Sequence, residues 1–241
     1  MEVMQSRSAS DLLTLWEQGL VQSPIQRAVL LLTALHPKKS LTVLAQFPIG
    51  QRDADLLTLR EHLFGTQLHS LVVCPACQHR LEFTLAVADL RVAAPMSDAV
   101  PVEVDGCELT VRLPTSEDIA AIAALTNPEQ ALLQRCVIAA TKAGEAIAVA
   151  DLPADVSAAV MDAIAEADPQ ADVQLDLSCP NCQHTWQSPF DIASFLWAEL
   201  DAWANRTLEQ VHRLARAYGW GEQDILNLTP YRRQRYLERV P

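Results

Sequence analysis

The chain has 241 residues, of which half are hydrophobic, and a formal net charge of −12. This size and composition predict a folded protein of one or two domains and exclude an intrinsically disordered one. The sequence has no apolar run near the ~20 residues of a membrane span, and its first residues lack the basic and apolar regions of a signal peptide. We therefore expect a cytoplasmic protein without membrane insertion.

The net charge lies in the middle of the chain. Residues 1–92 contain 8 basic and 8 acidic side chains and residues 179–241 contain 7 of each, whereas residues 93–178 contain 3 basic and 15 acidic ones. Proteins that bind nucleic acid normally present a basic face to the phosphates. The acidic middle therefore argues against nucleic acid as a partner, although acid on an exposed surface also serves solubility alone.

The first part of the chain predicts helices. Apolar periodicity with capping residues indicates helices over residues 10–20, 24–36 and 53–64, with Ser10 and Ser23 as caps and Gly65 as the stop of the third. A turn with two cysteines, Cys74 and Cys77, follows the apolar residues 71–73. The alternating segment 81–85 then predicts the return strand of a β-hairpin.

The middle of the chain predicts a second hairpin followed by helices. Asp105-Gly106 lies between two alternating segments, 100–104 and 108–113, which is a strong hairpin signal. Thr115 caps the next helix, and we expect helices over residues 119–125, 128–141 and 153–166. Cys136 falls on the apolar stripe of the second of these helices, which predicts a buried, unreactive thiol. The other members of that stripe are Leu132, Leu133, Val137 and Ala140.

The last part of the chain begins with a near-copy of the first cysteine turn. Cys179-Pro180-Asn181-Cys182-Gln183-His184 repeats the pattern of Cys74-Pro75-Ala76-Cys77-Gln78-His79. Alternating apolar residues at 173, 175 and 177 lead into it. A long helix is expected over residues 193–218, stopped by Gly219, and a short one follows Thr229-Pro230.

Two Cys-x-x-Cys turns supply the four sulfur ligands of a tetrahedral structural zinc site. The ligands would be Cys74, Cys77, Cys179 and Cys182, and 101 residues lie between Cys77 and Cys179. We therefore expect one Zn²⁺ that joins two distant segments and leaves no open position for catalysis. The alternatives are a disulfide within each pair, separate metal sites with other ligands, or a role for His79 or His184 in the metal shell.

The C-terminal residues are rich in aromatic side chains and arginine, which is typical of protein–protein contacts. The candidate partner-binding residues are Trp220, Tyr231, Arg232, Arg233, Arg235 and Tyr236. The alternative is that the aromatic side chains only pack the last helices onto the body of the protein. The sequence contains no Gly-rich phosphate loop, GxSxG elbow or HExxH motif, so we expect no enzymatic activity.

With these residues in view, the chain resembles the T4-type phage baseplate hub assembly proteins of contractile phage tails and related contractile injection systems. The resemblance lies in two C-terminal blocks and is looser over residues 48–77 and 112–118. The first block runs from Asp168-Pro169 through the second cysteine turn to Trp186, then Phe190-Asp191-Ile192 and Phe195–Leu200. The second runs over Leu214–Trp220, Asp224-Ile225-Leu226, Arg232-Arg233 and Tyr236-Leu237.

The resemblance implies a non-enzymatic assembly chaperone or structural component of a baseplate, with hub or wedge proteins as partners. The alternative is a zinc-ribbon nucleic-acid-binding or regulatory protein. The expected fold is α+β and mostly helical, with two zinc-knuckle hairpins joined at one four-cysteine site. We expect three regions: N-terminal helices and the first knuckle (1–92), an acidic insert of a small β-hairpin plus helices (93–170), and the second knuckle with C-terminal helices (171–241).

Overall fold

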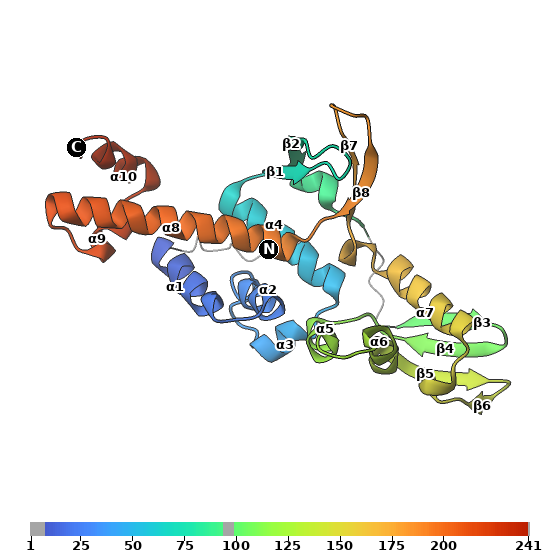
Figure 1. Cartoon of the computed structure of the whole chain (residues 1–241). Coiled ribbons are helices and arrows are strands. Elements are labelled where there is room, and N and C mark those ends of the chain that lie inside the picture. Colours follow the sequence, from blue (N-terminus) through green and yellow to red (C-terminus); the bar gives the residue numbers. More distant parts are fainter. Residues whose placement is uncertain (1–7, 94–98, 241) are drawn as a thin grey trace.

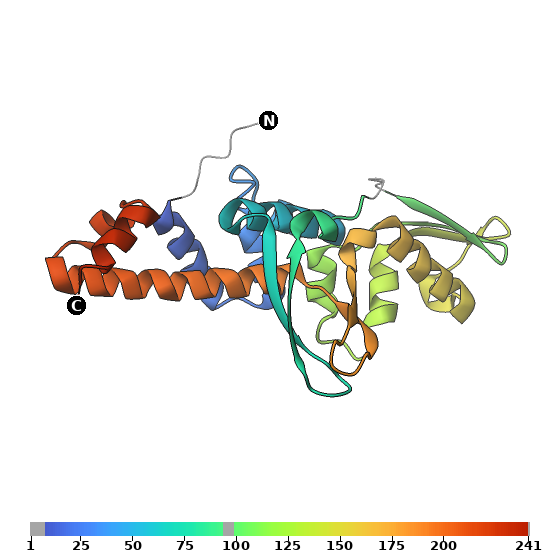
Figure 2. The same ribbon diagram turned by 90° about the horizontal axis from the view of Figure 1, so that it is seen from above.

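The computed structural model describes residues 8–93 and 99–240. The N-terminal residues on which we base the expectation of no signal peptide lie outside this range. The molecule is elongated, with the C-terminal helices at one end, a small sheet with a helix at the other, and two hairpins projecting side by side between them (Figures 1 and 2). Across the described part of the chain, no helix is both long enough and apolar enough to cross a membrane.

Four helices form the N-terminal part: α1 (Ala9–Leu20), α2 (Pro24–Leu32), α3 (Leu41–Ala45) and α4 (Ile49–Phe64). The predicted cap of the first helix is wrong by two residues, because Ser8 makes the capping box with Asp11. The short α3 was not predicted. α4 begins at Ile49 instead of Asp53, because the carboxylate of Asp168, far along the chain, accepts the backbone N–H of Gly50 at 2.8 Å.

The long helix α8 (Ile192–Tyr218) is the support on which the N-terminal helices pack (Figure 1). Its end is capped by Gly219 in the left-handed conformation, as the sequence predicts, and the side chain of Asp191 caps its start. Arg60 on α4 is fully buried and donates two hydrogen bonds to Glu199 on α8, each 2.8 Å. The first hydrophobic core joins α1, α2, α4 and α8 with the C-terminal helices α9 (Glu222–Leu226) and α10 (Pro230–Leu237).

The two hairpins that carry the cysteines are antiparallel pairs. The first consists of β1 (Gln67–Val73) and β2 (Arg80–Ala86), and the second of β7 (Gln174–Ser178) and β8 (Thr185–Pro189). The chain leaves β2 through the short helix η1 (Val87–Leu90) and enters β7 through η3 (Pro169–Ala171). The side chain of Gln170 on η3 joins the two connections, since it donates a hydrogen bond to the carbonyl of Leu90 at 3.1 Å and accepts one from the N–H of Val92 at 2.8 Å.

The insert between the hairpins has its own hydrophobic core. Its four-stranded antiparallel sheet packs against the last of its helices. The strands follow the order β3 (Val100–Val104), β4 (Cys107–Val111), β5 (Val137–Lys142) and β6 (Glu145–Ala146). The helices are α5 (Ser116–Ile122), α6 (Pro128–Cys136) and α7 (Ala154–Ala167), and the short η2 covers Val149–Asp151. The assignment of the insert as a separate domain stays a prediction.

One prediction for the insert is wrong. The expected helix over residues 128–141 ends at Cys136, and the next residues form β5, which pairs with β4. Hydrogen bonds to the open edge of β4 outweigh the local preference of this Ala-containing segment for a helix. The small β-hairpin that we expected is consequently a four-stranded sheet. Cys136 is fully buried as predicted, but Val137 and Ala140 belong to the strand.

Thr115 caps α5 as predicted, and its partner Asp118 is 1% exposed. Burial alone would raise the pKa of this carboxyl. Hydrogen bonds from Arg112, Thr115 and Arg135 nevertheless hold the pKa of Asp118 well below its usual range. This charge network fixes α5 and the end of α6 to the segment that follows β4.

Candidate metal centre

The two cysteine turns have the same backbone structure. In each turn the first cysteine donates its N–H to the carbonyl of the histidine five residues later, at 2.9 Å. The glutamine before that histidine adopts a left-handed conformation, with φ of 59° at Gln78 and 60° at Gln183. Its N–H donates back to the first cysteine, at 2.9 Å in one turn and 2.8 Å in the other. The repeated sequence therefore builds the same turn twice.

The four cysteine sulfurs meet where the tips of the two hairpins come together (Figure 2). Their Sγ atoms all lie within 4.8 Å of one another. The closest contacts join the two hairpins: Cys74 to Cys182 at 3.7 Å and Cys77 to Cys179 at 3.6 Å. Metal–sulfur bonds of about 2.3 Å in a tetrahedron place the sulfurs about 3.8 Å apart. The cluster can therefore hold a metal ion.

The alternatives of the sequence analysis can be compared with this geometry. All four cysteines are free thiols, and the close contacts run between the two pairs instead of within them. A disulfide needs about 2.05 Å between its sulfurs. Both histidines use their backbone carbonyls in the turns, and the ring of His184 stacks on Trp186 with centroids 5.9 Å apart. Among the described residues, the group that can hold a metal consists of the four cysteines.

Hydrogen bonds make the thiol of Cys77 lose its proton more easily than that of Cys182. The amide of Asn181, from the opposite turn, donates to its Sγ at 3.5 Å, and with the backbone of His79 it lowers the pKa of this thiol to about 6. At Cys182 the backbone of His184 favours the thiolate, but the neighbouring cysteines outweigh it and raise the pKa to about 12. Four thiolates can therefore share this point only when a cation offsets their repulsion.

The predicted partner-binding residues lie together at the C-terminal tip, which we define as the end of α8 from Asn205 onward with α9 and α10. Trp220 stacks on Tyr218 with centroids 4.7 Å apart, and Tyr236 meets Trp220 edge-on at 4.9 Å. These rings are half-buried against the first core, apart from Tyr218, which is 38% exposed. Packing of the last helices thus explains part of the aromatic content.

The remaining candidates differ strongly in exposure. Tyr231 is 76% exposed, and Arg232 and Arg235 are also exposed, with Arg235 paired to Glu238 at 2.8 Å. Arg233 is only 5% exposed, and its Nε and Nη1 atoms have no hydrogen-bond partner within the described residues. The sequence does not distinguish Arg233 from its neighbours, because its burial depends on which face of α10 packs against α8.

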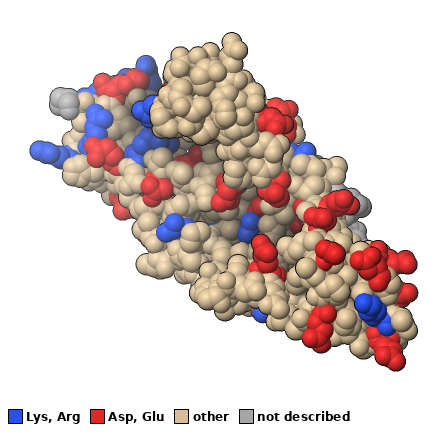
Figure 3. Space-filling view, turned by 45° about the vertical axis from the view of Figure 1, so that its right-hand side comes forward, with Lys and Arg blue, Asp and Glu red and all other residues tan. Residues whose placement is uncertain are grey.

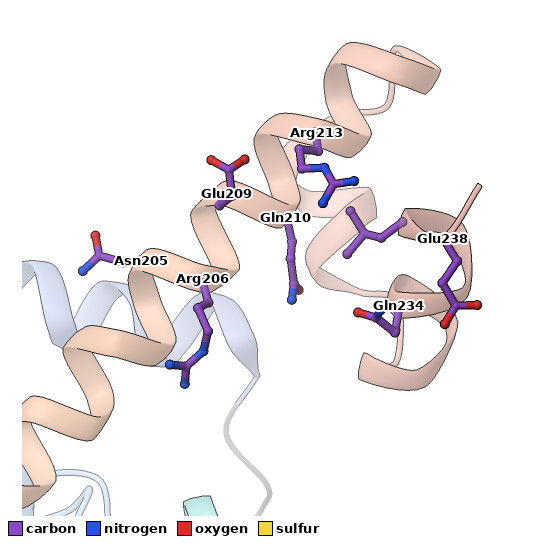
Figure 4. A pocket seen from close by; sticks show the side chains of 8 residues that line it. Asn205, Arg206, Glu209, Gln210, Arg213, Gln234 and Glu238 are labelled. Atoms are coloured by element: carbon purple, nitrogen blue, oxygen red, sulfur yellow. The ribbon is translucent and has the colours of Figure 1, made fainter. Parts of the chain in front are cut away.

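A cleft between α8 and α10 was missed by the sequence analysis (Figure 4). Arg206, Gln210 and Arg213 line its α8 side, and their spacing of four and then three residues puts them on one face of the helix. That spacing is the signal that could have indicated the cleft. Its position opposite α10 depends on how the last helices fold back.

The comparisons with known proteins point to one family. The family model described as T4 bacteriophage base plate protein matches residues 25–197, which include both cysteine turns and the whole insert. No curated protein and no solved structure matches the chain. Because the match covers well over half of the sequence, this chain belongs to the T4 bacteriophage base plate protein family.

Proposed function

We propose that this protein is a non-enzymatic assembly factor or structural component of a contractile, phage-tail-like baseplate. The observation that carries the proposal is the family match over residues 25–197. Proteins of a large assembly act through surfaces that recognise other proteins. The acidic insert and the aromatic, arginine-containing tip are surfaces of this kind.

The metal in this proposal is a structural Zn²⁺ bound by Cys74, Cys77, Cys179 and Cys182. Four sulfur donors at tetrahedral spacing favour zinc over the hard cations, which prefer oxygen. Bound there, the ion supplies charge neutralisation and a crosslink between the hairpins. Its shell is closed, so the cysteines hold the two turns in one position and no water is activated.

The proposed partners are hub or wedge proteins of the baseplate, and the C-terminal tip is the proposed contact surface. Tyr231 and Arg232 support this role, because both side chains are exposed and neither is used in the core. Arginine and tyrosine are enriched among the residues that dominate binding energy at protein interfaces. Trp220 and Tyr236 contribute through the shape of the tip, since they are half-buried.

The test is co-purification of the tagged chain, expressed with the other genes of the particle. We expect Tyr231→Ala combined with Arg232→Glu to reduce recovery of baseplate components at least tenfold, at unchanged helix content and zinc content. Arg80→Glu is the matched control, because Arg80 is an exposed arginine on β2 that lies outside the C-terminal tip. Equal recovery with both variants contradicts the proposed surface. Retention of nucleic acid with a steep salt dependence by the unaltered protein contradicts the assembly function as a whole.

A further inference from the structure

Arg233 is a buried cation that has no counter-ion among residues 8–93 and 99–240. Its side chain is 5% exposed, and neither Nε nor Nη1 has an acceptor within the described residues. Burial also lowers the pKa of this guanidinium. A buried charge is normally paired, because an unpaired one lowers the stability of the folded protein by roughly several kcal/mol. Among the described residues, no carboxylate of the tip pairs with Arg233, because its acids lie elsewhere and Glu238 pairs with Arg235.

The cleft between α8 and α10 presents two other arginines, Arg206 and Arg213 (Figure 4). It has a volume of about 650 Å³ and lies between α8 and α10. Gln234 and Leu237 line its α10 side. Gln234 follows Arg233 directly in the sequence, and Leu237 lies about one turn further along the helix. Arg206 and Arg213 line the α8 side, and both are exposed and make no ion pair within the described residues. Glu209 and Glu238 also line the cleft, so an acidic ligand must bind chiefly between the arginines.

The opposite end of the molecule carries an unbalanced acidic hairpin. Glu103 on β3 and Glu108 on β4 lie directly opposite each other in the strand register, and Asp105 occupies the turn between them. All three carboxylates are exposed. Like charges at opposite positions of a strand pair repel and destabilise the pair. Figure 3 shows acidic side chains gathered over this end of the molecule.

We propose that the acidic β3–β4 hairpin of one copy binds the arginine-lined α8–α10 cleft of a second copy. The two ends lie too far apart to meet within one chain, since they form opposite tips of the elongated molecule (Figure 1). The hairpin narrows to the two residues Asp105 and Gly106, so its tip can enter a cleft of this size. Pairing across this contact gives carboxylates to Arg206 and Arg213, and their positive charge offsets the repulsion between Glu103 and Glu108.

This arrangement joins unlike surfaces, so each copy keeps one free cleft and one free hairpin. Such head-to-tail contacts continue from copy to copy and produce a ring if the rotation closes or a filament if it does not. The proposal rests on the proposed function, because it names a second copy as one of the proteins that the C-terminal tip contacts. An acidic segment of another baseplate protein is the competing occupant.

Sedimentation of the full-length protein at low and high salt tests the proposal. We expect the wild type to associate beyond the monomer at low salt and to dissociate as salt screens the charges. Arg206→Gln with Arg213→Gln removes the cleft charges, and Glu103→Gln with Glu108→Gln removes the hairpin charges. Each variant alone is expected to be monomeric. Their equimolar mixture is expected to form 1:1 dimers and nothing larger, because only one intact hairpin and one intact cleft remain.

Two matched controls keep the result specific. Arg216→Gln removes an exposed arginine on α8 outside the cleft, and Asp162→Gln with Glu166→Gln removes two exposed acids on α7. Both controls should associate like the wild type. A wild type that stays monomeric at low salt overturns the proposal. If that monomer still recovers baseplate components and loses them with Arg206→Gln and Arg213→Gln, the proposed function stands and the occupant is another protein.

Discussion

The cysteine cluster and the C-terminal tip both bring together groups from distant parts of the chain, but only the cluster is complete within one chain. Four sulfurs converge within 4.8 Å, and an ion of the right charge satisfies all of them. At the tip, the Nε and Nη1 atoms of the buried Arg233 have no acceptor within the described residues, and Arg206 and Arg213 line an open cleft. A metal ion cannot satisfy a guanidinium, because both are cations and the guanidinium needs a hydrogen-bond acceptor such as a carboxylate.

This difference separates a structural site from a recognition site. In the proposed function, a Zn²⁺ bound by the cluster would neutralise the four thiolates, so its stabilising effect should appear in the isolated chain. The tip carries an electrostatic cost in the isolated chain that a partner's carboxylates would offset. Substitutions at the two places are therefore expected to change stability in opposite directions.

The largest expected effect is the loss of metal from variants of the two buried cysteines, Cys74→Ser and Cys179→Ser. Each removes one of four thiolates, so the zinc content should fall from about one atom per chain to well below one after dialysis against a mild chelator. Elemental analysis by mass spectrometry measures the zinc content per chain. Cys107→Ser is the control, since Cys107 is a buried thiol outside the cluster and should leave the zinc content unchanged. Two zinc atoms per wild-type chain contradict a shared site.

Removal of the metal from the wild type should lower the melting temperature while the helices persist. The hairpin tips lose their crosslink, but the first core and Gln170 still hold the two halves of the chain together. A loss of about 3 kcal/mol corresponds to a decrease of about 6–12 °C for a protein of this size. Calorimetry gives the shift, and far-UV circular dichroism at low temperature tests the helices. A collapse of the helical signal on chelation would show that the metal supports the whole fold.

A smaller effect of opposite sign is expected for Arg233→Met. Methionine keeps the apolar contacts of the side chain and removes a buried charge whose Nε and Nη1 have no acceptor in the described part of the chain, so the isolated protein should gain about 1–3 kcal/mol of stability. Denaturant unfolding measures the change. Arg232→Met is the neighbouring exposed control and should stay within about 0.5 kcal/mol of the wild type. Destabilisation by Arg233→Met would mean that the guanidinium is satisfied in solution and that the tip is complete without a partner.

Much of the local structure follows from the sequence alone. The two Cys-x-x-Cys turns adopt the same backbone because their hydrogen bonds join residues within five positions. Ser23 and Thr115 cap helices as predicted, and Gly219 ends α8, since these interactions also lie within one turn of the chain. Asp105-Gly106 makes the β3–β4 turn for the same reason. The sequence also predicts that the four cysteines of the two turns form one cluster, because paired Cys-x-x-Cys turns have few other uses.

The rest depends on contacts between segments that are distant in sequence. Residues 137–142 form a strand because β4 offers an unpaired edge, although their own pattern favours a helix. α4 begins four residues before the predicted start because Asp168 accepts a hydrogen bond at its first turn. Arg233 is buried and Arg232 exposed because α8 covers one face of α10. Local hydrogen bonds are specified by neighbouring residues, whereas edges, remote caps and covered faces exist only once the chain has folded.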